Sequence, residues 1–217
     1  KIKKPEDIKK NDKILNVLDV PLKFKKAFNV KHKESSNYVK KCLLIGHNLC
    51  LQKKIKGIIN CSINKKNLFK NKNLGVTEFL AKKNRVLNSE VMVIYNKYLS
   101  VVPLTTHIKV KDISKFIKKD FLSKKLITLN KCYIKYFKKT PRIAVLGLNP
   151  HNLELKKNSE ELKVIIPLIK YLKRKMKISG PYPPDTIFLK DNLKKFDVIV
   201  GMYHDQVLSP FKALYGF

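Results

Sequence analysis

Unbroken apolar runs that alternate with amphipathic helical segments are the feature that most constrains the fold of this chain. Residues 142–147 contain one such run, which ends in a glycine, and residues 197–200 contain another. Short runs of this kind are typical of strands that are buried on both faces of a parallel sheet. Between them, residues 160–172 repeat apolar side chains at helical spacing. A helix is therefore expected between two buried strands.

Similar patterns predict the other elements. Strands are expected over residues 13–20 and 57–61 and, as a hairpin, over 91–95 and 99–104; helices are expected over 36–51, 77–85, 112–118 and 121–137. Ser35 or Ser36 is a candidate N-cap of the first helix. No internal repeat of fixed period is visible. Helices that connect apolar strands predict an α/β fold with a largely parallel sheet.

The charge of the chain has two interpretations. There are 48 Lys and Arg against 16 Asp and Glu, a formal net charge of +32, which is typical of a nucleic-acid binder. However, only three of these cations are arginines, and the lysines are spread along the whole chain. We interpret the excess as a compositional drift towards Lys, Asn and Ile, as an AT-rich coding sequence would produce. We expect nonspecific binding of polyanions at low salt but no specific nucleic-acid partner.

Apolar content and cysteine spacing narrow the class of protein further. Hydrophobic residues make up 44% of the chain, which is enough to bury a core. No apolar run approaches the roughly 18 residues of a membrane span, so no membrane partner is expected. The four cysteines, Cys42, Cys50, Cys61 and Cys132, form no Cys-x-x-Cys pair. We interpret them as small buried side chains in a reducing cytoplasm.

Three of the five histidines follow predicted strands at a short distance. They are His107 after residues 99–104, His151 after 142–146 and His204 after 197–200. If these strands are adjacent, their carboxyl ends bring the three imidazoles to one edge of the sheet. Three neutral imidazoles with open positions suit a catalytic divalent metal, although any one of them alone would be a surface or capping residue. His32 and His47 have no such placement.

Four further residues could take part in chemistry, and each also has an ordinary explanation. Asp205 could orient the imidazole of His204 or bind a metal, or it could be an acidic residue at a helix start. Asp185 could transfer a proton, although its spacing favours a helix cap. Lys212 lies about two helical turns after His204, but it is one of many lysines. Thr77 opens a predicted helix, where phosphate or carboxylate groups bind.

Several strings in this sequence resemble the 4-hydroxythreonine-4-phosphate dehydrogenase family of vitamin B6 biosynthesis. They are Ile63-Asn64-Lys65, Gly75-Val76-Thr77-Glu78-Phe79-Leu80, Thr105-Thr106-His107, Leu146-Gly147-Leu148-Asn149-Pro150-His151, Gly180-Pro181 with Pro184-Asp185-Thr186, and Met202-Tyr203-His204-Asp205-Gln206 followed by Pro210-Phe211-Lys212. Their order and approximate spacing match the family over nearly the whole chain.

The resemblance implies a three-layer α/β/α two-domain fold like that of isocitrate and isopropylmalate dehydrogenases. It also implies a cytoplasmic homodimer whose active site lies at the interface between subunits. Family members oxidise 4-phosphooxy-threonine with NAD or NADP, and the resulting β-keto acid loses CO2 to give 3-amino-2-oxopropyl phosphate. A divalent metal ion, Zn, Mg or Co, would polarise the substrate hydroxyl in this reaction.

Residue roles follow from the resemblance at matching positions. It implies that His107, His151 and His204 bind the metal, with the third ligand supplied by the other subunit. It implies that Thr77 and Lys212 contact the substrate, and that Asp185 and Asp205 lie beside the metal and act in catalysis together with Lys212. No residue is assigned to the nicotinamide cofactor.

The sequence also departs from the family pattern. Val76 stands where the family usually has His, Val207 stands where it usually has Gly, and residues 152–159 replace a glycine-rich stretch. The family's terminal segments have no counterpart, so we expect residues 1–217 to be an interior fragment, incomplete at both ends and with little activity alone. Two alternatives stay open: a paralogue acting on another phosphorylated hydroxy acid, and a non-catalytic polyanion-binding module on the same fold.

Overall fold

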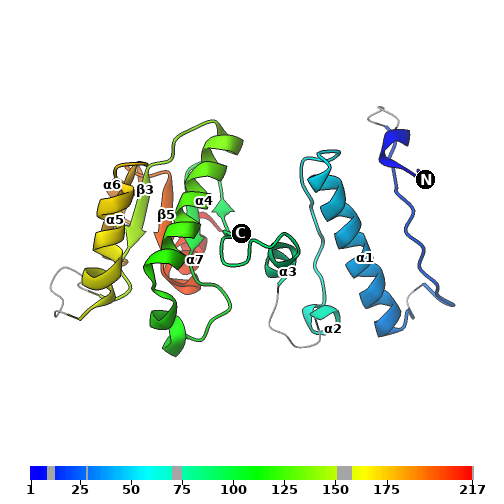
Figure 1. Ribbon diagram of the computed structural model, residues 1–217, viewed down its shortest axis with the longest axis horizontal. Helices are drawn as coiled ribbons and strands as arrows, with labels where there is room; N and C mark the ends of the chain where they lie inside the picture. The colour runs from blue at the N-terminus through cyan, green and yellow to red at the C-terminus, as the bar shows by residue number, and fades with distance from the viewer. Residues whose placement is uncertain (9–12, 28, 70–74, 151–157, 217) are drawn as a thin grey trace. The chain divides into compact units, whose positions relative to one another are not determined.

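The computed structural model describes residues 1–8, 13–27, 29–69, 75–150 and 158–216. The chain divides into two compact units, an N-terminal unit, Lys1–Leu80, and a sheet unit, Ala81–Phe217. Figure 1 shows the elements of each unit, which are described separately below. Within the described residues, no helix is long and apolar enough to cross a bilayer.

The sheet unit is built on five strands in the order β1-β2-β5-β3-β4. The strands are β1 (Ile94–Tyr95), β2 (Ser100–Pro103), β3 (Ile143–Leu146), β4 (Ile178–Tyr182) and β5 (Val198–Gly201). β1 pairs with β2 in an antiparallel hairpin, and all other pairs are parallel. The hairpin and the buried strands β3 and β5 are confirmed, and so is the largely parallel sheet.

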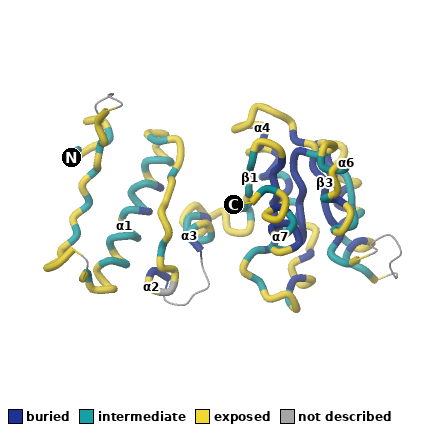
Figure 2. The backbone as a smooth tube through the Cα atoms, turned by 180° about the vertical axis from the view of Figure 1, so that it is seen from behind, coloured by how far each residue is buried: buried dark blue, intermediate teal, exposed yellow. Residues whose placement is uncertain are grey.

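Helices cover both faces of this sheet. They are the 3-10 helix η2 (Val110–Phe116), α4 (Lys119–Phe137), the π-helical turn η3 (Glu161–Ile165) continuing into α5 (Ile166–Leu172), α6 (Lys190–Leu193) and α7 (His204–Tyr215). Val198 and Val200 of β5 pack with α4 and α5, whereas Ile199 packs with α7 on the opposite face. Figure 1 shows α4 and α5 in front of the sheet, and Figure 2, from behind, shows α7 in front. The sheet unit is therefore a three-layer α/β/α structure.

The N-terminal unit is mainly helical in its described part. It contains the 3-10 helix η1 (Pro5–Asp7), α1 (His32–Leu51), α2 (Lys65–Phe69) and the beginning of α3 (Val76–Lys83). Its apolar cluster consists of Leu43, Leu68 and Phe69, with Val39, Ile63, Val76 and Phe79 packed against it. Figure 2 shows that much of the remaining backbone of this unit is exposed.

Both strands predicted in the N-terminal unit are wrong. The only pairing in residues 13–20 is an isolated bridge between Ile2 and Leu18, and Leu15 is 85% exposed. Ile59, in the segment predicted as a buried strand, is fully exposed. Alternation or an apolar run does not make a strand where no neighbouring ladder accepts its backbone hydrogen bonds.

Several boundaries and burial predictions also need correction. Helix α1 begins at His32, and the hydroxyls of Ser35 and Ser36 donate to backbone carbonyls of His32 and Asn67 rather than capping a helix. The helix predicted over 112–118 is the 3-10 helix η2. None of the four cysteines is buried, because Cys61 and Cys132 are exposed and the other two are half-buried. Strand β4 has no predicted counterpart, whereas α7 begins at His204, where a helix start was one of the two explanations for Asp205.

A cluster of charges fixes the amino end of β5. Asp197 is 8% exposed and accepts hydrogen bonds from the backbone N–H of Arg142 (2.9 Å), from its guanidinium (3.1 Å) and from Lys139 Nζ (2.8 Å). Burial raises the pKa of this carboxyl, but the hydrogen bonds outweigh it and lower the pKa to about 2 from an ordinary 3.8. The cluster ties β5 to the chain that enters β3.

We predict that Asp197→Asn lowers the free energy of unfolding at pH 7 by about 1–2 kcal/mol, since the two cations are partly exposed and screened. Because the folded pKa is depressed, this contribution is fully present above about pH 4 and is lost as the pH falls towards 2. Urea unfolding of both proteins between pH 7 and pH 2.5 measures the difference. Asp191→Asn, at an exposed position, is the control. A difference that is unchanged at pH 2.5 would contradict the assignment.

Candidate active site

The candidate site lies where three neighbouring parallel strands end. β2, β5 and β3 are adjacent and parallel, so their carboxyl ends share one edge of the sheet, here called the carboxyl edge. His107 follows β2 by four residues and is exposed, and His204 follows β5 as the first residue of α7. His151 lies outside the described residues. The strands that lead to the three histidines are adjacent, which was the condition for bringing these residues to one edge.

Backbone pairing continues past the ends of β2 and β5. The N–H of Leu104 donates to Gly201 O (2.9 Å), and that of Thr105 donates to Met202 O (3.1 Å). The Thr105 hydroxyl donates to the same Met202 carbonyl at 2.6 Å, and Thr105 is buried. Two buried bonds to one carbonyl therefore fix the segment that carries His107 beside the segment that carries His204.

Gln206 joins the end of β5 to the end of β3. Its side-chain Oε1 accepts from the N–H of Met202 (2.7 Å), and its Nε2 donates to the carbonyl of Gly147 (2.7 Å). The side chain is 8% exposed, so both bonds are shielded from water. Gln206 thereby links the end of β5 to the end of β3. Sequence reasoning missed this role, because nothing in a single sequence distinguishes a bridging amide from any other polar residue in a first helical turn.

The imidazole of His204 is oriented by its neighbour. Nδ1 lies 2.8 Å from Asp205 Oδ1, and the His204 side chain is 44% exposed. A carboxylate that engages one ring nitrogen fixes the orientation of the ring and keeps Nε2 for binding a ligand. This contact fits the expectation that Asp205 orients a ligating imidazole.

The remaining candidates occupy exposed positions. Asp185 lies in a run of turns between β4 and α6, and the N-cap of α6 is Leu189, so the predicted capping role of Asp185 is wrong. Lys212 lies on α7, the same helix as His204, in its last turn. Thr77 lies in the first turn of α3 in the N-terminal unit.

The imidazole side chains at the carboxyl edge are of a type that binds divalent metal ions. His204 has one ring nitrogen engaged by a carboxylate and the other available, which is a common arrangement for a ligand to zinc or cobalt. Among the residues that the structure describes, no three His, Cys, Asp or Glu side chains converge as a metal site. His107 and His204 are thus two candidate ligands at one edge.

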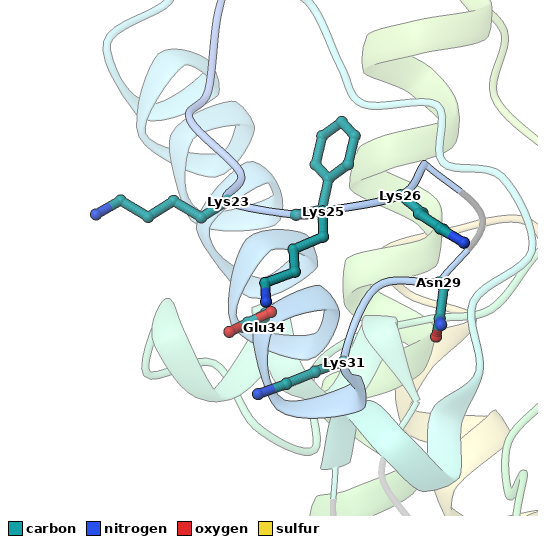
Figure 3. A pocket seen from close by; sticks show the side chains of 7 residues that line it. Lys23, Lys25, Lys26, Asn29, Lys31 and Glu34 are labelled. Carbon is teal, nitrogen blue, oxygen red and sulfur yellow. The ribbon is translucent and has the colours of Figure 1, made fainter.

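A basic hollow lies in the N-terminal unit. It has a volume of about 500 Å³ and is lined by Lys23, Phe24, Lys25, Lys26, Asn29, Lys31 and Glu34, as Figure 3 shows. Four of these seven residues are lysines, and one is acidic. Such a surface attracts anions nonspecifically.

We predict that Gln206→Leu destabilises the sheet unit by roughly 2 kcal/mol, because it leaves the buried N–H of Met202 without its acceptor. Amide hydrogen exchange at Met202 should accelerate more than exchange in β1. Gln52→Leu is a matched control, since Gln52 is the other glutamine of the chain and is exposed. Equal stability of the two variants in urea would show that the bridge does not hold the strand ends.

Comparison with known proteins shows one consistent family. The family model described as pyridoxal phosphate biosynthetic protein PdxA matches residues 1–217. The chain is 43% identical over 142 residues to a 4-hydroxythreonine-4-phosphate dehydrogenase of Aquifex aeolicus, and this match covers 64% of this chain and 43% of that protein. It is 32% identical over 225 residues to a D-threonate 4-phosphate dehydrogenase of Pectobacterium atrosepticum, and this match covers all of this chain and 68% of that protein.

Solved structures agree with the sequence comparison. The crystal structure of a 4-hydroxythreonine-4-phosphate dehydrogenase from Klebsiella pneumoniae has a TM-score of 0.85 and 27% identity, and the match covers 99% of this chain and 67% of that one. Neighbours of this kind have the isocitrate/isopropylmalate dehydrogenase-like fold, so the predicted fold class is confirmed. The chain spans about half the length of several curated relatives that it matches. With all 217 residues matched by its model, the chain belongs to the PdxA family.

Proposed function

We propose that the complete protein is an NAD- or NADP-dependent 4-hydroxythreonine-4-phosphate dehydrogenase acting in pyridoxal phosphate synthesis. Its substrate would be 4-phosphooxy-threonine, which loses a proton from its hydroxyl and a hydride to the nicotinamide. The β-keto acid then loses CO2 and gives 3-amino-2-oxopropyl phosphate. The observation that carries the proposal is the carboxyl edge, where His107 and an oriented His204 follow adjacent parallel strands.

The proposed metal site consists of three imidazoles. His107, His151 and His204 would hold a divalent ion, Zn, Mg or Co, with one of them supplied by the second subunit of a cytoplasmic homodimer. When bound, the ion would act as a Lewis acid on the substrate hydroxyl. The buried bonds of Thr105 and Gln206 support this arrangement, because they hold the backbone before His107 and before His204 to fixed neighbours.

The other residues would serve binding and proton transfer. Asp205 would keep the His204 ring in one orientation through its 2.8 Å contact. Lys212 would attract the negative substrate and hold a proton near the reacting carbon, and Asp185 would accept or return a proton. Thr77 would contact the substrate from the first turn of α3, where backbone N–H groups favour anions.

A second candidate is a dehydrogenase for a related phosphorylated acid such as D-threonate 4-phosphate. Val76 replaces the usual histidine of the family, and its side chain packs against the apolar cluster of the N-terminal unit. This position therefore offers no polar contact to a substrate amine or hydroxyl. The relative from Pectobacterium atrosepticum, which is named for D-threonate 4-phosphate, matches the full length of this chain.

The non-catalytic alternative rests on the basic hollow of the N-terminal unit. Its four lysines would bind phosphate-rich polymers electrostatically, and such binding weakens steeply with salt. Sequence-selective affinity for a nucleic acid that persists at physiological salt would favour a binding module over the dehydrogenase.

We predict that the full-length protein binds about one divalent ion per subunit and that His204→Ala lowers the affinity by more than the roughly 10–100-fold that loss of an orienting neighbour costs. Metal content after dialysis and isothermal titration measure the effect. His32→Ala is the control, because His32 lies on α1, where its Nδ1 is 3.1 Å from Asn67 Nδ2. Unchanged metal content in His204→Ala would exclude His204 as a ligand.

The substrate is tested by NADH formation with two acids under identical conditions. With metal present, we expect a higher kcat/KM for 4-phosphooxy-threonine than for D-threonate 4-phosphate. The reverse order would favour the second candidate. If neither acid is oxidised by a metal-loaded full-length protein, the dehydrogenase proposal is wrong.

A further inference from the structure

A buried carboxylate holds the segment that leaves β3. Glu161 has no exposed surface, and its Oε1 accepts from the backbone N–H groups of Leu148 (2.8 Å) and Asn149 (2.9 Å). The side-chain amide of Asn149 also donates to Oε1 (3.4 Å) and Oε2 (3.2 Å). Because a carboxylate is tolerated without water only where hydrogen bonds replace the lost hydration, the carboxylate and this segment depend on each other.

A second carboxylate engages the same amide. Oε2 of Glu160, which is half-buried, accepts from Asn149 Nδ2 at 3.1 Å. An ionised carboxylate has no donor and can only accept hydrogen bonds. The side-chain nitrogen of Asn149 therefore faces both glutamates, and its side-chain oxygen is turned away from them. The two glutamates thus set the orientation of the Asn149 side chain, but only Glu161 also binds the backbone.

The position of Glu161 in its helix supports a role beyond packing. It is the first residue of η3, a π-helical turn, and such turns occur frequently at functional sites. The turn continues directly into α5, whose residues Leu168, Ile169 and Leu172 are buried in the core. A carboxylate on a helix anchored in this way is a rigid support for the segment it binds.

We propose that Glu161 is a positioning residue of the carboxyl edge, which fixes the backbone of Leu148 and Asn149 where the chain leaves β3. The inference rests on the proposed function, in which His151 is a metal ligand. Only Pro150 separates Asn149 from His151, and proline restricts both its own backbone and that of the residue before it. Glu161 thereby does for the end of β3 what Gln206 does for the end of β5.

The test uses Glu161→Gln in the full-length protein, with Glu160→Gln as the matched control. The glutamine keeps the shape of Glu161 but has one acceptor oxygen instead of two. With that oxygen in the place of Oε1, its N–H₂ group faces Asn149 Nδ2 across the 3.2 Å contact, and the remaining bonds lose the negative charge that strengthens them. We expect faster amide exchange in the peptide that contains Leu148 and Asn149, and Co²⁺ binding about 10–100-fold weaker by titration of its visible absorption. Glu160→Gln should stay within about threefold of the wild type, because its backbone support is intact.

A second variant, Glu161→Asp, distinguishes weaker Co²⁺ binding caused by misfolding from weaker binding caused by lost positioning. This variant keeps the carboxylate but shortens it, so it should fold and show an intermediate Co²⁺ affinity. The proposal is overturned if exchange at Leu148 and Asn149 is unchanged, or if Co²⁺ affinity stays at the wild-type value when exchange is fast. Wild-type protein that binds no Co²⁺ would overturn the proposed function instead, whereas the exchange rates test the hold of Glu161 on this segment in either case.

Discussion

The position of β5 determines most of what the sheet unit can do. Val198, Ile199 and Val200 are completely buried, with β2 on one side, β3 on the other and a helical layer on each face. At its amino end, Asp197 accepts hydrogen bonds from Arg142 and Lys139. These contacts along the strand and at its amino end determine the position of its carboxyl end. The residues that follow it therefore emerge beside those that follow β2 and β3, and this shared exit creates the candidate site.

The charges that matter for this structure are the few negative ones. The chain has three times as many basic as acidic residues, and most of the lysines are exposed. Asp197 and Glu161, in contrast, are buried, and each accepts several hydrogen bonds from backbone and side-chain donors. Lys125 is a buried exception among the lysines, and its Nζ donates to the carbonyl of Glu90 at 2.6 Å. The large positive charge is thus mainly on the surface, whereas the few buried carboxylates hold backbone segments of the sheet unit in place.

Sequence patterns predicted the sheet unit well because its signals are strong and mutually consistent. Buried strands β3 and β5 appear as apolar runs, and α4 appears as a single apolar stripe, since each packs on a large core. The same patterns failed in residues 13–20 and 57–61, because the described part of the N-terminal unit contains no sheet with which these segments could pair. For the site, the sequence showed that three histidines follow apolar strands, whereas the adjacency of those strands is a property of the fold. The supporting contacts of Thr105, Gln206 and Glu161 were not predictable, because they are made to backbone atoms of segments distant in sequence.

Supports that bind backbone atoms also explain how the chain departs from its family without losing the carboxyl edge. Val207, which stands where the family usually has glycine, is completely buried and packs on the α7 side of the sheet. A Cβ at Gly201 would lie 2.6 Å from Val207 Cγ1 and 2.9 Å from Gln206 Oε1, so the larger residue at 207 makes glycine necessary at 201. The bonds of Gln206 to Met202 N–H and Gly147 O are made alongside this packing. Because both bonds are made to backbone atoms, neighbouring side chains such as that of residue 207 can differ from the family while the ends of β5 and β3 stay joined.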